Sequence, residues 1–293
     1  MKKKYVIVGA NYNRFGNYKA IPGAQKSGLD WKSFLDENGF QSKEIITGEN
    51  ATRENILPAL TNLFANLEKD DFAVFIYVGH GNQTKIKGKN YQFSREETDG
   101  YDEVLICDGT PITDDEIRTL LNLNKNKAPV FILIDACYNG VIEKSTPVLT
   151  DFSENNEIAI SSATQLGTAY MEDYSHTKQA VYSTFLLKVL RENMTKNYNT
   201  VFDLTRDKLK ENKYRQNPQL AFTNYSILNS IFFTAPINKS SLTLTSFEYQ
   251  TIQKDPFKGQ TGLTKENEKM FTYLKDLTLK TINYVKFRLS PQH

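Results

Sequence analysis

Three short and almost wholly apolar runs, Tyr5–Gly9, Phe72–Val78 and Val130–Ile134, recur along the chain. Apolar runs of this length without polar alternation are typical of strands that are buried on both faces of a sheet. Segments in which apolar residues recur at helical spacing separate the runs, for example residues 52–67. This alternation predicts an α/β fold with a mostly parallel central sheet and helices on both of its faces.

The other expected elements are less strongly patterned. A helix carrying Leu29, Trp31 and Phe34 is predicted to stop at Asn38-Gly39. Further strands are predicted at 43–47, 103–107 and 158–162, helices at 114–121, 179–192 and 199–212, and apolar segments at 219–222 and 227–233. The polar stretches 82–100 and 141–156 are expected to be surface loops of the kind that carry function.

Composition narrows the class of protein. The 293 residues can bury one large core, and 36 Lys and Arg against 34 Asp and Glu give no reason to expect a nucleic-acid partner. The longest apolar run has seven residues, whereas a bilayer span needs about 20, so no membrane partner is expected either. Two cysteines cannot form a disulfide framework, and the N-terminus lacks a signal-peptide core. We therefore expect a cytoplasmic protein.

The chain changes character after residue 235. Residues 236–293 hold 9 Lys and Arg against 5 Asp and Glu, with Ser- and Thr-rich stretches. Apolar residues recur at partly helical spacing between 265 and 289. We expect a main domain at 1–235 and a partly helical C-terminal extension at 236–293, to which the sequence assigns no role.

His80 and Cys137 stand just past two of the buried runs. Active sites of parallel sheets lie beyond the carboxyl ends of the strands. A cysteine nucleophile needs a nearby base or imidazolium and backbone N–H donors for the oxyanion. Taken singly, His80 could be a structural loop histidine and Cys137 an inert buried thiol. Their shared position favours a catalytic pair, with the N–H groups of Gly81 and Cys137 as oxyanion donors.

The segments Tyr77–Gly81 and Ile134–Gly140 resemble the histidine and cysteine motifs of the caspase-fold peptidases, most closely those of the metacaspases. Cys137 follows His80 by 57 residues, in agreement with a histidine about 50 residues upstream of the cysteine. The resemblance extends over about residues 4–234. Further matching segments follow in order: Gly23 with the helix leading to Asn38-Gly39-Phe40, Ala51–Ile56, Asp99–Glu103, Thr113–Ile117, Ile160–Ala163, Tyr182–Phe185 and Gln216–Leu220.

The resemblance implies a caspase-like three-layer sandwich and a cysteine endopeptidase. Cys137 would attack the peptide carbonyl and His80 would protonate the leaving amine. Asp135 stands where related arginine-cleaving peptidases have the aspartate of the P1 pocket, and where caspases have glutamine. A carboxylate there selects a cationic side chain, so cleavage after Arg or Lys is expected. The alternative is a strand-end aspartate that only satisfies loop N–H groups.

Some positions depart from the family pattern. The family usually has serine where this chain has Val78, and its His-Ser pair after the cysteine is Tyr138-Asn139 here. Its second pocket aspartate aligns with Ser27, and Asp30, on the same helical face, could substitute. The resemblance thus implies an S1 pocket formed by Asp135, Asp30 and Ser27 that is less acidic than usual.

Many metacaspases need calcium. Asp102, Asp114 and Asp115 match three of the family's calcium positions, and carboxylate oxygens suit Ca²⁺. The fourth position would be Lys144, which repels a cation. Alternatively, Asp114 and Asp115 belong to the first turn of a helix that Thr113 and Glu116 cap, where acidic side chains favour the helix dipole. Lys144 lies in a loop that family members often cut during activation, and it is either a processing site or an ordinary solvated lysine.

The expected partners follow from the same resemblance. They are protein or peptide substrates with Arg or Lys at P1, and no cofactor is required for the chemistry itself. An activating ligand or protein could act on the loops 82–100 and 141–156 or on the extension, because loops of that length can order on activation. The alternative function is a catalytically weak or inactive caspase-fold scaffold or ligand-sensing module. The presence of both His80 and Cys137 favours the enzyme.

Overall fold

The computed structural model describes residues 1–11, 20–41, 44–85, 101–137, 156–162, 171–174, 177–223 and 225–234. The C-terminal extension 236–293 and the predicted loop 141–156, except for Asn156, lie outside the described residues, and so does Lys144. The side chain of Asp102 also lies outside them, although its backbone is described. The predictions made for these positions therefore stay predictions.

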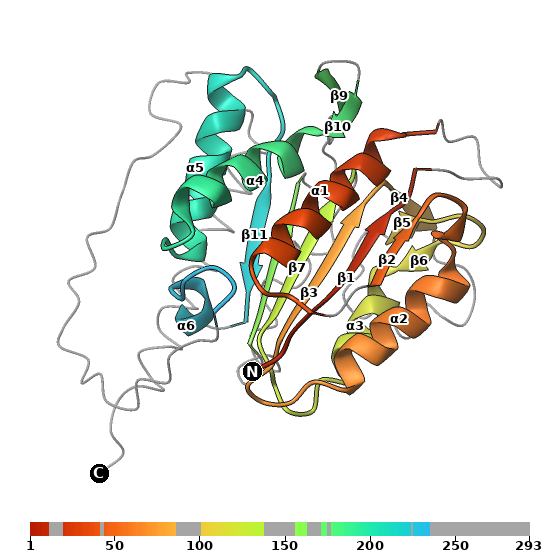
Figure 1. The fold of residues 1–293 in the computed structure, drawn as a ribbon. Helices are drawn as coiled ribbons and strands as arrows, with labels where there is room; N and C mark the ends of the chain where they lie inside the picture. The colour runs from red at the N-terminus through yellow and green to blue at the C-terminus, as the bar shows by residue number, and fades with distance from the viewer. Residues whose placement is uncertain are drawn as a thin grey trace, which may run out of the picture. The chain divides into compact units, whose positions relative to one another are not determined.

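Six strands form the main sheet, in the order β11-β8-β7-β3-β1-β2 (Figure 1). They are β1 (Lys3–Gly9), β2 (Glu44–Thr47), β3 (Phe72–Val78), β7 (Val130–Asp135), β8 (Glu157–Ser161) and β11 (Gln219–Phe222). The first five are parallel, and β11 runs antiparallel to β8. The three apolar runs are the adjacent strands β1, β3 and β7, so the prediction of buried parallel strands is confirmed.

Helices cover both faces of this sheet (Figure 1). One face carries α1 (Gly23–Glu37), α4 (Val181–Asn193) and α5 (Tyr198–Glu211), and the other carries α2 (Arg53–Ala65) and α3 (Asp114–Leu121). Alternate residues of a strand point to opposite faces, so Phe72, Val74 and Ile76 join one core cluster while Ala73, Phe75 and Tyr77 join the other. The expected three-layer α/β architecture is confirmed. A short α6 (Tyr225–Leu228) and the 3₁₀ turn at Gly48–Asn50 complete the helical segments described.

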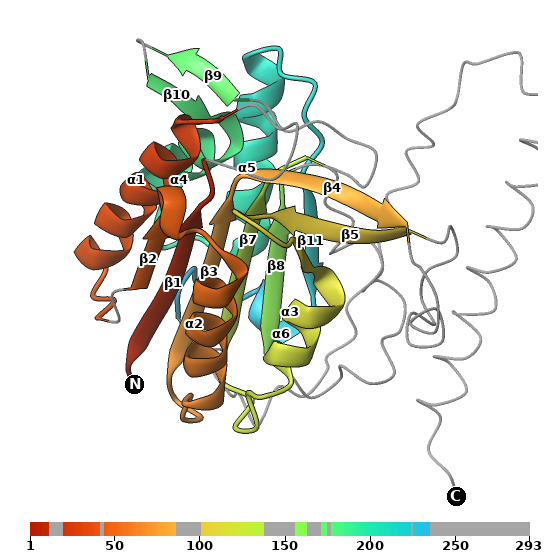
Figure 2. The same cartoon turned by 90° about the vertical axis from the view of Figure 1, so that its right-hand side faces the viewer.

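A second, antiparallel sheet forms at the carboxyl end of the main sheet. It consists of β4 (His80–Lys85), β5 (Tyr101–Ile106) and β6 (Ile112–Thr113), and Figure 2 shows β4 and β5 running across the ends of the main strands. The loop predicted at 82–100 is therefore wrong in its first part. Its polar side chains suggested a loop, but backbone pairing with β5 holds residues up to Lys85 in a strand.

A hairpin of β9 (Met171–Tyr174) and β10 (Thr177–Ala180) precedes α4 and was not expected from the sequence. Two details of the helices also differ from expectation. Leu29, predicted on this helix together with Trp31 and Phe34, is 43% exposed, because the buried face of α1 runs through Ala24, Ser27 and Trp31. The helix predicted from the pattern at 52–67 is α2, and the side chain of Thr52, which precedes it, makes no capping hydrogen bond.

Phe233 closes the core on the side of α1. Its ring meets those of Phe34, Phe40, Phe72 and Phe131, at centroid distances from 5.2 to 6.1 Å. The backbone reaches this position through a left-handed conformation, with φ of 59° at Phe233. One ring at the end of the described chain thus joins the first helix to two strands of the sheet.

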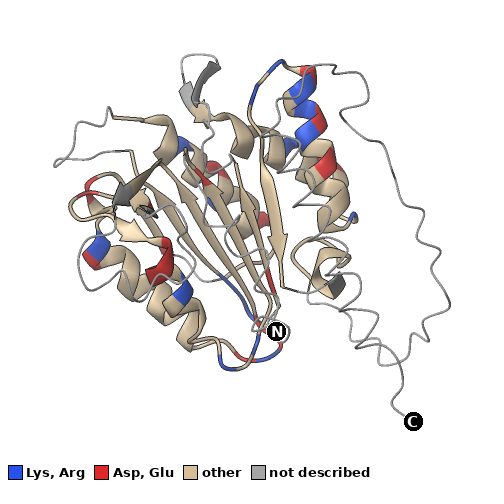
Figure 3. Ribbon diagram, turned by 180° about the vertical axis from the view of Figure 1, so that it is seen from behind, with Lys and Arg blue, Asp and Glu red and all other residues tan. Residues whose placement is uncertain are grey.

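Most charged residues lie on the helices and loops, and those in the strands of the main sheet lie at or near strand ends (Figure 3). Within the described part of the chain, no helix has the length and apolar character needed to cross a bilayer.

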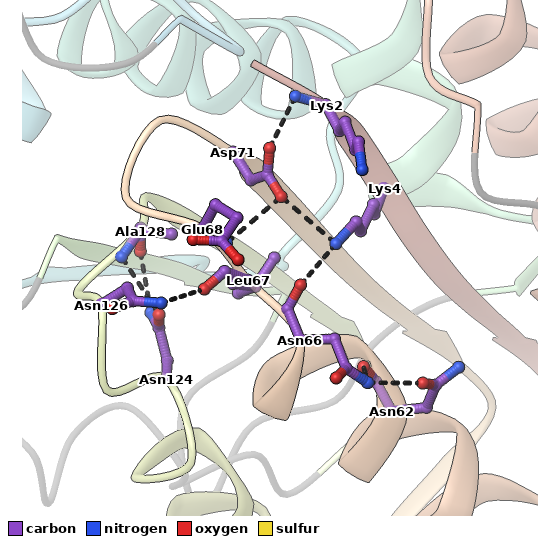
Figure 4. Close-up of polar contacts among 10 residues, drawn as sticks. All are labelled: Lys2, Lys4, Asn62, Asn66, Leu67, Glu68, Asp71, Asn124, Asn126 and Ala128. Carbon is purple, nitrogen blue, oxygen red and sulfur yellow. Dashed lines mark hydrogen bonds and ion pairs between the residues drawn. The ribbon is translucent and has the colours of Figure 1, made fainter.

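The amino-terminal end of the main sheet is held by a polar network (Figure 4). Asp71, just before β3, accepts hydrogen bonds from the backbone N–H of Lys2 at 2.7 Å and of Glu68 at 3.2 Å. Its second oxygen also pairs with Lys4 Nζ at 3.2 Å, which donates to the carbonyl of Asn66 at 2.6 Å. Burial alone would raise the pKa of Asp71, but these contacts outweigh it and lower the pKa.

Candidate active site

The register of two neighbouring strands brings His80 and Cys137 to the same end of the sheet. Val78 of β3 lies opposite Asp135 of β7, and the N–H of Gly79 donates to the Asp135 carbonyl at 3.2 Å. His80 and Cys137 each follow this register pair by two residues, and both side chains are partly exposed. The strand order reverses between β1 and β3, so the two residues lie next to the topological switch point of the sheet.

The backbone at His80 is held by Tyr77. The Tyr77 hydroxyl lies 2.8 Å from the carbonyl oxygen of His80 and 2.7 Å from that of Ile106. A Cβ on Gly79 would lie 2.5 Å from this hydroxyl, closer than real Cβ atoms come. Glycine at position 79 therefore allows the tyrosine to hold the start of β4.

Gly81 lies in β4, opposite Leu105 of β5. The residue predicted to donate its N–H to an oxyanion is thus part of the strand that follows His80. The oxyanion role of Gly81 and Cys137 stays a prediction.

Asp135 is buried, with 2% of its surface exposed. Its Oδ2 accepts hydrogen bonds from the N–H of Ser183 at 2.8 Å and from the Ser183 hydroxyl at 2.6 Å. Its Oδ1 is buried and has no hydrogen-bond partner. Burial raises the pKa of Asp135, and the hydrogen-bonding groups of Ser183 and the nearby Ser162 hydroxyl oppose that rise.

Ser27 and Asp30, on α1, contact the segment 179–183 that also holds Asp135. The Ser27 hydroxyl accepts from the N–H of Ala180 at 3.0 Å. Asp30 accepts from Gln179 Nε2 at 3.0 Å and pairs with Lys26 one helical turn earlier. The carboxylate of Asp30 is thus already partnered by a cation on its own helix.

Ser183 is the main residue that sequence reasoning missed. It joins α1 to the site, because its hydroxyl accepts from Trp31 Nε1 at 3.0 Å while donating to Asp135. Its neighbour Tyr182 is fully buried and its hydroxyl has no hydrogen-bond partner. The signal available was the segment Tyr182–Phe185, which matches the family but carried no assigned role.

Two of the three acidic residues proposed for calcium, Asp114 and Asp115, lie at the start of α3, and Asp102 lies in β5. Asp114 is buried and its Oδ1 accepts from the N–H of Asp115 at 3.0 Å. Thr113 and Glu116 form the predicted capping box. Among the side chains that the structure describes, no group of three His, Cys, Asp or Glu residues is arranged to hold a metal ion. Calcium binding with Asp102 therefore remains a prediction.

Cys107 contrasts with Cys137. It is buried, and its thiol donates to the carbonyl of Thr110 at 2.9 Å. Burial raises the pKa of the Cys107 thiol to about 11. A thiol of this kind is a poor nucleophile at neutral pH, as expected for a structural cysteine.

Comparison with known proteins agrees with this geometry. The family model of the caspase domain matches residues 2–226. Metacaspase-1 of Candida albicans is 30% identical over 155 residues, and metacaspase-8 of Arabidopsis thaliana is 32% identical over 149 residues. Each alignment covers 48% of this chain, and 34% and 38% of the respective relative, so the chain spans little more than a third of these relatives' length.

The fold also matches a solved structure. The crystal structure of protein GSU0716 from Geobacter sulfurreducens superposes with a TM-score of 0.62 at 17% identity. The match covers 80% of this chain and 99% of that one, and at this low identity it supports only the similarity of fold. Together with the family match over most of the sequence, the position of His80 and Cys137 at the ends of adjacent strands leads to one conclusion: this chain belongs to the caspase-domain family of cysteine peptidases, with metacaspases among its distant relatives.

Proposed function

We propose that the protein is a regulated cysteine endopeptidase that uses Cys137 and His80 to cleave after Arg or Lys. The main support for the proposal is the register of β3 and β7. Val78 pairs with Asp135 at the end of these strands, and His80 and Cys137 each follow two residues later. A nucleophile and a proton carrier at neighbouring strand ends can act on the same peptide bond.

The chemistry follows from these two side chains. The Cys137 sulfur attacks the peptide carbonyl, and the oxyanion that forms accepts from the N–H groups of Gly81 and Cys137. His80 gives its proton to the leaving amine, and the C–N bond breaks to leave a thioester on Cys137. His80 then takes a proton from water, the resulting hydroxide attacks the thioester, and the sulfur leaves with release of the acid.

Asp135 supports the preference for a basic P1 residue. A buried carboxylate with one unpartnered oxygen is costly unless a cation or donor reaches it. A guanidinium or ammonium group bound there would also favour the ionised form, against the effect of burial. Ser27 and Asp30 would act more weakly, since both already have partners within the domain.

The test is hydrolysis of fluorogenic peptides that differ only in having Arg, Lys or Asp at P1. Wild type and Cys137→Ala are compared with and without Ca²⁺, and Cys107→Ala is the matched control. We expect cleavage after Arg and Lys by wild type and by Cys107→Ala, and none by Cys137→Ala. The calcium arms decide whether the metal activates the protein.

Each other outcome has a definite reading. Cleavage after Asp would overturn the role of Asp135 and leave the Cys-His pair standing. If no peptide is cleaved and an arginyl chloromethyl ketone does not label Cys137, the protein is the alternative, a scaffold or ligand-sensing module. Labelling without turnover would mean that a competent site awaits an activating ligand or protein.

A further inference from the structure

The first turn of α4 has no capping side chain of its own. The residue that precedes the helix is Ala180, whose methyl group cannot accept a hydrogen bond. The N–H groups at the start of a helix have no acceptors within it, and when they are buried they must bind groups on other elements. At α4 this applies to the N–H groups of Ala180 and Ser183.

Asp135, at the end of β7, supplies the missing cap. Its Oδ2 accepts from the N–H of Ser183, the third residue of α4, at 2.8 Å, which is the contact that an N-cap side chain normally makes. The positive end of the helix dipole also favours a carboxylate there. The Ser183 hydroxyl donates to the same oxygen at 2.6 Å, and the Ser162 hydroxyl lies nearby. The orientation of the Asp135 carboxylate therefore depends on where the first turn of α4 lies.

Helix α1 holds that turn at two points. The Ser27 hydroxyl oxygen accepts from the N–H of Ala180 at 3.0 Å, and Trp31 Nε1 donates to the Ser183 hydroxyl at 3.0 Å. Ser27 and Trp31 lie one helical turn apart on the buried face of α1. Two contacts, one at the residue before α4 and one at its third residue, fix both the position and the rotation of the turn that carries the donors to Asp135.

We propose that Ser27 is a positioning residue for Asp135, which it aligns through the first turn of α4. The inference rests on the proposed peptidase function. The resemblance implied that Ser27 lines the S1 pocket, but its oxygen already accepts a buried N–H, and a neutral hydroxyl gives a cation little to bind. Without that oxygen the Ala180 N–H would be buried and unsatisfied, so the turn would move toward another acceptor and carry the donors of Asp135 with it.

The experiment compares two reagents that alkylate Cys137. An arginyl chloromethyl ketone depends on Asp135 to bind its guanidinium, whereas iodoacetamide depends only on the thiol. The second-order rate constant of each is measured by mass spectrometry of the peptide that contains Cys137. The ratio of the two constants reports recognition of the basic side chain separately from the reactivity of the sulfur. Wild type is compared with Ser27→Ala.

Two further variants make the comparison specific. Ser33→Ala is the matched control, because Ser33 lies on the exposed side of α1 and its hydroxyl donates to the Leu29 carbonyl of the same helix at 3.1 Å. Ala180→Pro breaks the contact of Ser27 from the other side. The φ of Ala180 is −66°, the value that proline requires, so this variant removes the N–H and keeps the helix start.

We expect Ser27→Ala and Ala180→Pro to lower the ratio about fivefold or more, the factor that corresponds to about 1 kcal/mol for a lost hydrogen bond. The rate with iodoacetamide should change less than about twofold, and Ser33→Ala should keep both rates. In an Asp135→Asn background, Ser27→Ala should lower the ratio no further, because the hydroxyl acts only through the carboxylate.

Three results would overturn the inference alone. They are an unchanged ratio in Ser27→Ala, a parallel slowing of both reagents, and an equal effect of Ser27→Ala with and without Asp135, which would mean that Ser27 acts directly on the P1 side chain. If Ser27→Ala does not fold, Ala180→Pro decides by the same criteria. If the ketone does not label wild type, or labels it with no higher ratio than Asp135→Asn, the proposed function fails and this inference with it.

Discussion

At the scale of single residues, two buried aspartates at opposite ends of the sheet have pKa values shifted in opposite directions. Burial raises the pKa of Asp135, whose Oδ1 has no partner. Hydrogen bonds and Lys4 lower the pKa of Asp71 against the effect of burial. One carboxylate therefore costs stability when it is ionised and the other contributes stability (Figure 4 shows the contacts of Asp71).

We predict that Asp135→Asn stabilises the fold while abolishing cleavage after basic residues. The folded protein binds the Asp135 proton more tightly than the unfolded chain, so its stability falls as pH rises from the unfolded pKa, about 3.9, through the raised folded pKa. The amide carries no charge and escapes this loss. Thermal unfolding between pH 4 and 9 should show the melting temperature of Asp135→Asn rising above that of wild type as pH increases.

Asp71→Asn is the control with the opposite sign. Because the folded pKa of Asp71 is lowered, its contribution to stability is present above the unfolded pKa and is lost as pH falls through the folded value. Asp71→Asn should therefore melt below wild type at neutral pH, with the deficit shrinking in acid. If both variants shifted in the same direction at neutral pH, the contrast between the two ends of the sheet would be wrong.

At the scale of secondary-structure elements, α1 and α4 are joined at the site through one hydroxyl. Ser183, in the first turn of α4, accepts from Trp31 of α1 and donates to Asp135 at the end of β7. The helices α1 and α4 and the strand β7 are far apart in the sequence, and Trp31 and Ser183 are separated by 152 residues. The serine therefore couples the packing of two helices to the orientation of a carboxylate.

We predict that Ser183→Ala lowers the free energy of unfolding by about 1–3 kcal/mol, because it leaves the buried Trp31 N–H without an acceptor. It should also lower kcat/KM for Arg peptides, since Oδ2 keeps only the backbone donor and the carboxylate is held less firmly. Urea unfolding and the peptide assay measure the two effects. Ser33→Ala, on the exposed side of α1, should change neither, and a variant of Ser183 that loses stability but keeps full activity would contradict the coupling.

The elements that the sequence predicted well are those with strong local patterns. The three apolar runs became β1, β3 and β7, and the capping box at Thr113 marked the start of α3. The short strands were harder, because β4 and β9 are polar segments whose structure comes from pairing with a partner strand. The same limit applied to the site: His80 and Cys137 follow patterned strands, whereas the contacts of Ser183 and Tyr182 depend on packing that no local spacing reports.

At the scale of the whole domain, the aromatic cluster around Phe233 unites segments from both ends of the described chain. We predict that Phe233→Ala lowers the free energy of unfolding by about 3–5 kcal/mol, as expected for deletion of a buried ring that contacts five others. Ile231→Ala is the control. Its side chain is 43% exposed, so the change should stay within about 0.5 kcal/mol in urea unfolding.

The position of Phe233 also bears on the order in which the domain is completed during synthesis. Strands β1, β2 and β3 and helices α1 and α2 lie within the first 78 residues, so the half that leads to His80 can pair early on the ribosome. Cys137 emerges later, Ser183 later still, and the ring that closes the core is nearly the last described residue. A nascent chain can therefore contain both reactive side chains while the fold that orients them is unfinished. The arrangement of the two side chains in the finished core therefore depends on a segment that is synthesised after both of them.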